Sequence, residues 1–345
     1  MKIILKERQV KKLIKEDMGV SRICITYSNI ILNKLTPLID DFIQNKKTNR
    51  TKLVITLKEL SDAWQTNIDE YIEFPISEIR IDFYTFLKSE GQLNGTYSTG
   101  GGAEQIEPKS TKSSYITSPP DTLPKYVREQ IDSTLNAKFD IEIHMTNEFD
   151  DSEKTELIYD LRDTILHETN HMFEFFKKNE SGSGYVNVAL GLSGTKNYNV
   201  PRDIFDIWQE FTTMVYFSEP QEMRAMTQEM YSVRERVPFE TFKQHRYYEA
   251  SKIMQEFNAD VMFDNMVERI ELYNPDYLIP ILTNLWKWFM VDYLATLKVL
   301  KMTPDPKIQN SVHVLQLMKI LQPRINNAGK KLQRNFNRLY SIDTK

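Results

Sequence analysis

Apolar residues in the first half of the chain follow two different periods. Between 21 and 44 they recur every three or four residues, which predicts an amphipathic helix. Between 78 and 86, and again between 138 and 145, apolar and charged residues alternate, which predicts half-buried strands. Two shorter strand candidates lie at 52–57 and at 93–99, the second of them at a sheet edge before a run of glycines.

Glycine shows where regular structure is interrupted. Glycines cluster at 91–102 and at 182–194, and none occurs from 195 to 328. Because glycine and proline punctuate secondary structure, we expect this glycine-free region to be helical throughout. Its apolar spacing predicts helices at 202–217, 220–234, 239–272, 275–301, 308–321 and 324–340. The segment 110–125, rich in Ser, Thr and Pro, is predicted to be a loop or linker.

These elements predict an α+β fold with a small mixed or antiparallel sheet and a mainly helical C-terminal region. We divide the chain into an N-terminal α/β part at 1–130, a core at 131–236 and a helical C-terminal region at 237–345. The core contains a further predicted helix at 151–178, which begins with Ser152 and two glutamates in its first turns.

Composition bounds the classes of function. The chain has 345 residues, of which 41% are hydrophobic, and this is enough to bury a real core. Its formal net charge is −4, so bulk charge indicates neither a nucleic-acid partner nor a membrane surface. The basic side chains of the predicted helix at 324–340 are interpreted as its solvent-exposed face. The apolar stretch at 277–300 is interrupted by Lys287, Asp292 and Lys298, so we expect a buried helix and not a membrane span.

The choice of metal ligands is narrow. Cys24 is the only cysteine, so a metal ion has to be held by His, Asp or Glu side chains. The histidines are His144, His167, His171, His245 and His313.

Five consecutive residues of the 151–178 helix match a metal-binding pattern. His167-Glu168-Thr169-Asn170-His171 fits H-E-x-x-H. Residues four apart lie one above the other on a helix face, so two imidazoles can reach one ion at about 2.0–2.1 Å each. Glu168 then lies to the side of the metal and can take a proton from the activated water. The pattern predicts one Zn²⁺ ion bound by His167 and His171. The alternative is a pair of surface histidines on a charged helix face.

The surrounding helix has the two faces that such a site requires. One stripe is apolar and the other is polar. The apolar stripe comprises Leu157, Leu161, Ile165, Met172 and Phe176, and the polar stripe comprises Asp160, Asp163, Thr164, His167, His171 and Glu174. We therefore expect the helix to bury its back and to present its histidines to a cleft.

This segment resembles the active-site helix of the zincin metallopeptidases. The resemblance covers roughly 138–231 and implies a zincin-like domain, a peptide or protein substrate, and Glu168 as general base. It also implies an edge strand that lies along the cleft and pairs with extended substrate, for which the strand at 138–145 is the candidate. Thr169 departs from the family, in which an aliphatic residue is usual at that place.

A third ligand is required, because a catalytic zinc keeps three protein ligands and one open position. No histidine follows His171 at short spacing, so the three-histidine arrangement of metzincins is absent. A glutamate on a later helix is the other solution, and we favour Glu222. Pro220 suits the first turn of a helix, and the small Ala225 permits close approach. The competing candidates are Glu210, Glu219 and Glu229.

The segment 216–225 resembles the E-x-x-A helix of gluzincin-type zincins, and also zincin-like proteins encoded by tailed phages. In gluzincins an Asp often follows the small residue and supports a ligand histidine, whereas this chain has Met226. Candidate donors to a developing oxyanion are His245, Tyr231 and Tyr198. His245 is more simply interpreted as a surface histidine.

Two functions from different classes are consistent with these residues. The first is a zinc-dependent metallopeptidase, which Glu168 favours because a silent protein has no chemical reason to keep a base between its ligands. The second is a catalytically silent zincin-like structural or binding protein, for example a phage virion component. Met226 and the large helical C-terminal region favour the second. With no signal peptide or membrane span in the sequence, we expect a cytoplasmic protein, or a virion protein if it is phage-encoded.

Overall fold

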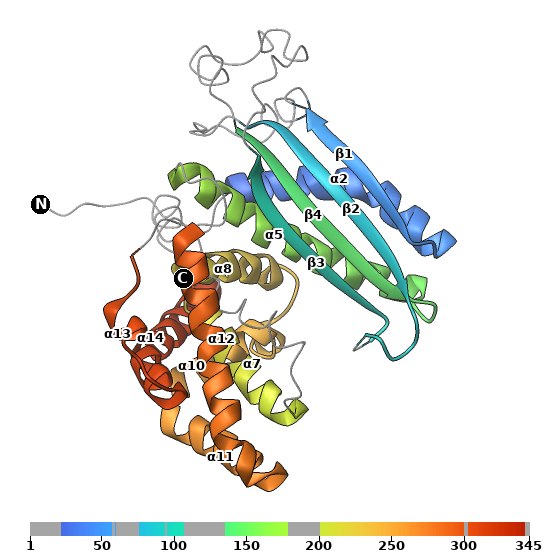
Figure 1. Cartoon of the computed structure of the whole chain (residues 1–345). Coiled ribbons are helices and arrows are strands. Elements are labelled where there is room, and N and C mark those ends of the chain that lie inside the picture. Colours follow the sequence, from blue (N-terminus) through green and yellow to red (C-terminus); the bar gives the residue numbers. More distant parts are fainter. Residues whose placement is uncertain are drawn as a thin grey trace, which may run out of the picture. The chain divides into compact units, whose positions relative to one another are not determined.

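The computed structural model describes residues 22–56, 59, 76–93, 95–106, 135–178, 201–299 and 303–341. The chain divides into two compact units, Met1–Ser183 and Gly184–Lys345, and each is described separately. The fold is α+β, with one small mixed sheet and a long helical C-terminal region, as the sequence predicts (Figure 1). The predicted division at 130 and 236 stays a prediction.

The sheet of the first unit has four strands in the order β1-β2-β4-β3. The strands are β1 (Asn49–Thr56), β2 (Ile76–Lys88), β3 (Tyr97–Ile106) and β4 (Leu135–Thr146). β2 pairs with β4 in parallel, whereas β1 with β2 and β3 with β4 are antiparallel. The sheet is therefore mixed.

Two strand predictions need correction. The strand expected at 93–99 is β3, which begins at Tyr97 and contains the glycine run Gly100 to Gly102. The strand expected along a cleft at 138–145 is β4, but β4 lies between β2 and β3. The edge strand next to it is therefore β3. Pairing of the glycine backbone with β4 supplies the hydrogen bonds that strand formation requires, although glycine itself has low strand propensity.

Helices α2 (Arg22–Asn45) and α5 (Lys154–Lys178) cover one face of this sheet (Figure 1). The alternation predicted for β2 and β4 is confirmed. Buried side chains point from both strands toward the helices, namely Ile79, Ile81, Phe83, Phe139, Ile141, Ile143 and Met145. The opposite face carries polar residues. His144 lies there, stacked on Phe86 with 4.7 Å between ring centroids, so it is a histidine of the sheet surface.

The second unit is helical throughout its described residues, apart from short connections. Its longer helices are α7 (Arg202–Phe217), α8 (Pro220–Arg234), α10 (Arg246–Glu256), α11 (Ala259–Tyr273), α12 (Leu278–Val299) and α14 (Val314–Ser341). Two short helices, α9 (Phe239–Phe242) and α13 (Pro306–Gln309), connect them. Trp208 is fully buried beside Phe211 and Phe289, so it belongs to the core of this unit. No described helix combines the length and apolar content needed to cross a membrane.

The helix boundaries differ from the predictions at two places. The single helix expected at 239–272 is broken into α9, α10 and α11. Each break lies where a side chain caps the start of the next helix. The His245 side chain accepts a hydrogen bond from the Tyr247 amide at the start of α10, and the Asn258 side chain accepts one from the Asp260 amide at the start of α11. The helix expected at 308–321 begins only at Val314, because Ile308 belongs to the short helix α13. From Val314 on, it forms a single helix α14 with the helix expected at 324–340, and α14 continues through Pro323.

Gly329 allows α14 to approach α10 very closely. A Cβ atom at this position would lie 2.5 Å from the backbone nitrogen of Gln255 and 2.7 Å from the carbonyl oxygen of Ser251. Both neighbours are backbone atoms of α10, so neither can move independently of the helix. Only glycine fits without separating the two helices.

We expect Gly329→Ala to lower the free energy of unfolding by about 1–3 kcal/mol, the usual cost of overpacking. In an ordinary helix interior the same substitution stabilises by about 1 kcal/mol, so the sign is diagnostic. Urea denaturation followed by circular dichroism measures it, with exposed Asn327→Ala on the same helix as the control. A stabilised Gly329→Ala variant would contradict the packing described.

Candidate metal centre

The helix α5 is initiated by a capping box just before it. The Asp150 side chain accepts a hydrogen bond from the Ser152 amide, and the Glu153 side chain bonds back to the Asp150 amide. Four side chains of its predicted apolar stripe are fully buried, namely Leu157, Leu161, Ile165 and Met172. Leu166, next to the stripe, is also buried. Phe176 and Glu174 belong to the predicted stripes, but their side chains lie outside the described set. The helix therefore buries its back, as predicted.

His167 and His171 lie together on the other side of α5. Their Nε2 atoms are 3.1 Å apart, and their rings meet edge to face with 4.8 Å between centroids. Two nitrogens bound to one tetrahedral zinc at about 2.0–2.1 Å would be roughly 3.4 Å apart. His171 is buried and His167 is half-buried. The separation of the two nitrogens is therefore close to that on a shared tetrahedral ion.

Glu168 lies against the edge strand. A Cβ atom at Gly101 would be 3.1 Å from Cγ of Glu168 and 3.0 Å from Cγ2 of Thr164, so β3 and α5 touch at this glycine. Two further contacts continue along both elements. The Thr99 and Thr164 hydroxyl oxygens are 3.0 Å apart, and the Tyr97 hydroxyl donates to Asp160 at 2.8 Å.

This contact ladder has a simple geometric origin. Two residues of a strand span about 6.6 Å, and four residues of a helix rise about 6 Å. Steps of two along β3 therefore match steps of four along α5, from Tyr97 to Gly101 and from Asp160 to Glu168. Burial and the Asp160 carboxylate also raise the pKa of Tyr97. The ladder holds Glu168 beside the backbone of β3.

Thr169, the departure from the zincin pattern, is accommodated without loss of packing. Its side chain is fully buried, and its hydroxyl group donates to the Ile165 carbonyl oxygen at 2.7 Å. A threonine whose hydroxyl group is satisfied within its own helix can replace an aliphatic residue at a buried position.

Glu222 is in the first turn of α8. Pro220 occupies the first helical position, and Glu222 is buried although it carries a carboxylate. His167, His171 and Glu222 form a group of side chains that could hold a metal ion. The prediction that these three residues bind one zinc ion stays a prediction.

The competing glutamates have other environments. Glu210 is exposed on α7. Glu219 forms an ion pair with Arg324, and Glu229 forms one with Arg246 at 3.2 Å. The choice of Glu222 over these glutamates as third ligand stays a prediction.

The remaining site candidates take ordinary structural roles where they are described. Met226 is fully buried, so it fills space at the place where a gluzincin has Asp. His245 caps α10 through its Nδ1 atom, which accepts from the Tyr247 amide at 3.3 Å. Tyr231 is buried with the Arg234 guanidinium over its ring. Tyr198 and the segment 110–125 lie outside the described residues.

One partly buried polar cluster in the second unit was not predicted. Arg246 donates to both Glu229 and the Tyr247 hydroxyl group, at 3.2 Å each. Burial, followed by the charge of Glu229 and of Glu222, raises the pKa of Tyr247. Sequence spacing does not predict such a cluster, because Glu229 belongs to α8 and the other two residues belong to α10, with α9 between them in the chain.

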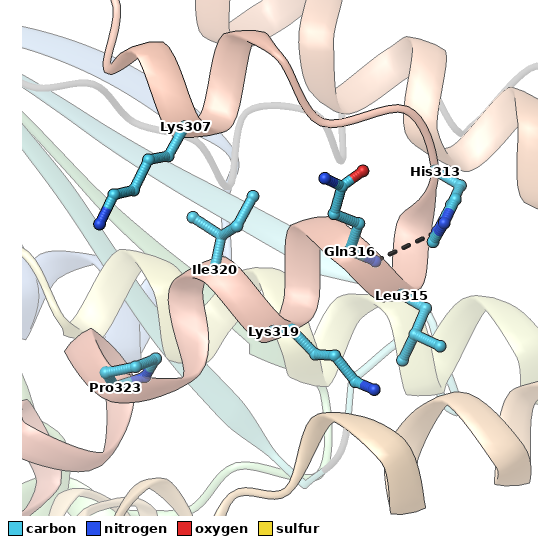
Figure 2. Close-up of a pocket in the computed structure, with 7 residues that line it drawn as sticks. All are labelled: Lys307, His313, Leu315, Gln316, Lys319, Ile320 and Pro323. Atoms are coloured by element: carbon cyan, nitrogen blue, oxygen red, sulfur yellow. Dashed lines mark hydrogen bonds between the residues drawn. The ribbon is translucent and has the colours of Figure 1, made fainter.

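The second unit also has an open pocket, which is lined by a different set of residues. It lies at α13 and the start of α14 and has a volume of about 500 Å³. Figure 2 shows residues that line it, among them Lys307, His313 and Lys319. His313 accepts a hydrogen bond from the Gln316 amide and so caps α14. Neither the histidine pair nor Glu222 lines this pocket.

In comparisons with known proteins, the chain matched no family model, no curated protein and no solved structure. The zincin resemblance therefore rests on the residues of the motif and on their geometry.

Proposed function

We propose that this chain is a zinc-dependent metallopeptidase that binds one Zn²⁺ ion through His167, His171 and Glu222. The observation that carries the proposal is the histidine pair of α5, whose Nε2 atoms lie 3.1 Å apart on the same helix as Glu168. Two imidazoles and one carboxylate are a usual donor set for a catalytic zinc that keeps one open position.

The donor chemistry fits zinc better than a hard cation. Calcium and magnesium prefer oxygen ligands, whereas imidazole nitrogen suits zinc and neighbouring transition metals. The 3.1 Å separation of the two Nε2 atoms is close to the separation on one tetrahedral ion. Both histidines come from one helix, so the pair is already formed before metal binds.

Glu168 is the general base in this proposal. When bound, zinc polarises the scissile carbonyl and acidifies a water molecule. Glu168 accepts a proton from the attacking water and passes it to the leaving amine nitrogen. Its contact with the backbone at Gly101 fixes the side chain next to the edge strand. The two ligand histidines flank it in sequence, so base and metal ligands are positioned by the same helix.

The edge strand β3 offers a place for the substrate. β3 pairs with β4 on one side and with no described strand on the other. An extended peptide can add to such an edge through main-chain hydrogen bonds. A peptide bound in this way passes the Gly101 position, where Glu168 contacts the strand. The class of substrate is therefore an extended peptide or a flexible protein segment.

The choice of third ligand is tested by a matched set of alanine variants. We expect Glu222→Ala to weaken zinc binding by about 100- to 1000-fold, because one of three ligands is lost. Glu219→Ala and Glu210→Ala each remove one carboxylate from the same helical unit and are expected to retain full zinc content. Competition with a chromogenic chelator measures the affinity. Zinc loss in Glu219→Ala with full retention in Glu222→Ala would refute the assignment.

Metal content and turnover together separate the enzyme from a silent binding protein. Stoichiometric zinc with cleavage of a quenched fluorescent peptide library supports the peptidase. Zinc without cleavage of any peptide supports the silent zincin-like alternative, for which a phage particle is one setting. For the peptidase we propose a cytoplasmic location.

A further inference from the structure

No described residue covers the glycine run of β3 on the face of the sheet that points away from α2 and α5, apart from Glu142. Gly101 points toward α5, so its neighbours Gly100 and Gly102 face the opposite side of the sheet. A Cβ atom at Gly102 would meet nothing within 4 Å. A Cβ atom at Gly100 would meet only Glu142, whose Cβ and Oε2 atoms are each 3.9 Å away. The carboxylate of Glu142 therefore leans over a strand position that has no side chain.

Glu142 is held in this place by its neighbours. It is paired with Gly100 across β3 and β4, and its Oε2 atom is 3.1 Å from Nε2 of His144. His144 is fixed in turn by stacking on Phe86. A carboxylate has about four lone-pair sites, so this contact leaves room for a further donor. The Glu142 side chain is 43% exposed and can be reached from solvent.

Two other carboxylates on the same face of the sheet each have a cationic partner. Asp140 lies 3.0 Å from the Lys138 ammonium group, and Asp82 lies 2.9 Å from the Arg50 guanidinium. Only Glu142 among these three carboxylates extends toward the position beside the free edge of β3. Glu142 is paired with Gly100, and the next residue of β3, Gly101, contacts Glu168.

Strand geometry connects Glu142 to a bound peptide. An added strand lies about 4.8 Å from β3, and the residue opposite Gly100 points its side chain to the same face as Glu142. Because residue 100 has no side chain, a long side chain can lie across it and reach the carboxylate. Lysine and arginine have apolar stems that can cover a glycine backbone and cationic ends that complement Glu142.

We propose that Glu142 and Gly100 form a specificity subsite that selects a lysine or arginine side chain of the peptide at the position opposite Gly100. This inference rests on the proposed function, because it places the peptide on the edge of β3 next to Glu168. It assigns the substrate class as peptides with a basic residue adjacent to the cleaved bond.

The test compares peptides that differ at one position in Lys, Gln or Glu. Binding is measured by fluorescence polarisation on the zinc-loaded Glu168→Gln protein, and cleavage is measured on the wild type. We expect the Lys peptides to bind about fivefold more tightly than the Gln peptides, the effect of one partly exposed ion pair. Glu142→Gln is expected to remove this preference, and Glu142→Lys to shift it toward the Glu peptides. Gly100→Val, which covers the strand, is expected to remove it as well.

Asp140→Asn is the matched control, because it removes one charge from the same strand and face. It is expected to keep the preference for lysine. An unchanged preference in Glu142→Gln, equal binding of the three peptides by the wild type, or no binding at all would each overturn the inference. Lysine-selective binding without cleavage would support the subsite and contradict the peptidase. Cleavage without lysine selectivity would contradict the subsite alone.

Discussion

Replacement of His171 by alanine is expected to abolish stoichiometric zinc binding. His171 is buried, and its Nε2 atom is 3.1 Å from that of His167. Apparent zinc-binding free energies of about 10–16 kcal/mol at four-ligand sites correspond to about 2.5–4 kcal/mol for each ligand. Loss of one ligand then weakens affinity by about 100- to 1000-fold. Metal analysis after dialysis against a weak chelator measures the effect directly.

His144→Ala is the control for this prediction. His144 lies on the opposite face of the sheet, where it contacts Phe86 and Glu142, so its removal is expected to leave the zinc content at one ion per chain. Zinc should also raise the melting temperature of the wild type and of His144→Ala, but not that of His171→Ala, since a ligand that binds only the folded state stabilises it. Full zinc content in His171→Ala would refute the assignment of ligands.

Periodicity was sufficient to predict the parts of the fold that are set by local burial. The alternation at 78–86 and 138–145 predicted two strands whose apolar residues are buried toward the helices. The stripe from Leu157 to Met172 predicted a helix with a buried back. In each case, one residue pattern specifies which face is removed from water, and no distant partner is needed to recognise it.

The glycine run shows where this reasoning fails. Glycine has no side chain to alternate, so Gly100 to Gly102 carry no strand pattern and were expected to follow a strand and not to form one. They are in β3 because of pairing with β4 and contact with α5, which are interactions between distant parts of the chain. The strand nearest to Glu168 was therefore assigned incorrectly.

Helix breaks in the second unit had a related cause. His245 and Asn258 each interrupt a region with continuous helical spacing by capping the next helix with a side-chain acceptor. Histidine and asparagine also occur in helix interiors, so the residue type alone does not mark a helix boundary. The candidate ligands were easier to predict, because the four-residue spacing of His167 and His171 is local. Only the choice among distant glutamates required an argument from helix-start chemistry.

Glu168→Gln is expected to reduce peptide hydrolysis by about 10²–10⁴-fold while zinc content stays at one ion per chain. Glutamine has nearly the same shape as glutamate and can keep the contact with the backbone at Gly101. It has no carboxylate to accept the proton of the attacking water. The loss should therefore be in kcat, because peptide binding along β3 does not depend on this proton transfer.

Glu156→Gln is the matched control, since Glu156 is an exposed residue of the first turn of the same helix. It removes the same charge at a distance from the histidine pair and is expected to keep full activity. Steady-state kinetics on one quenched fluorescent peptide, with zinc content measured on the same samples, compares the two variants. If Glu168→Gln retains wild-type kcat, Glu168 is not the base, and the proton must go to another group. If it loses zinc as well as activity, Glu168 acts in metal binding, and the separation of base from ligands on α5 is wrong.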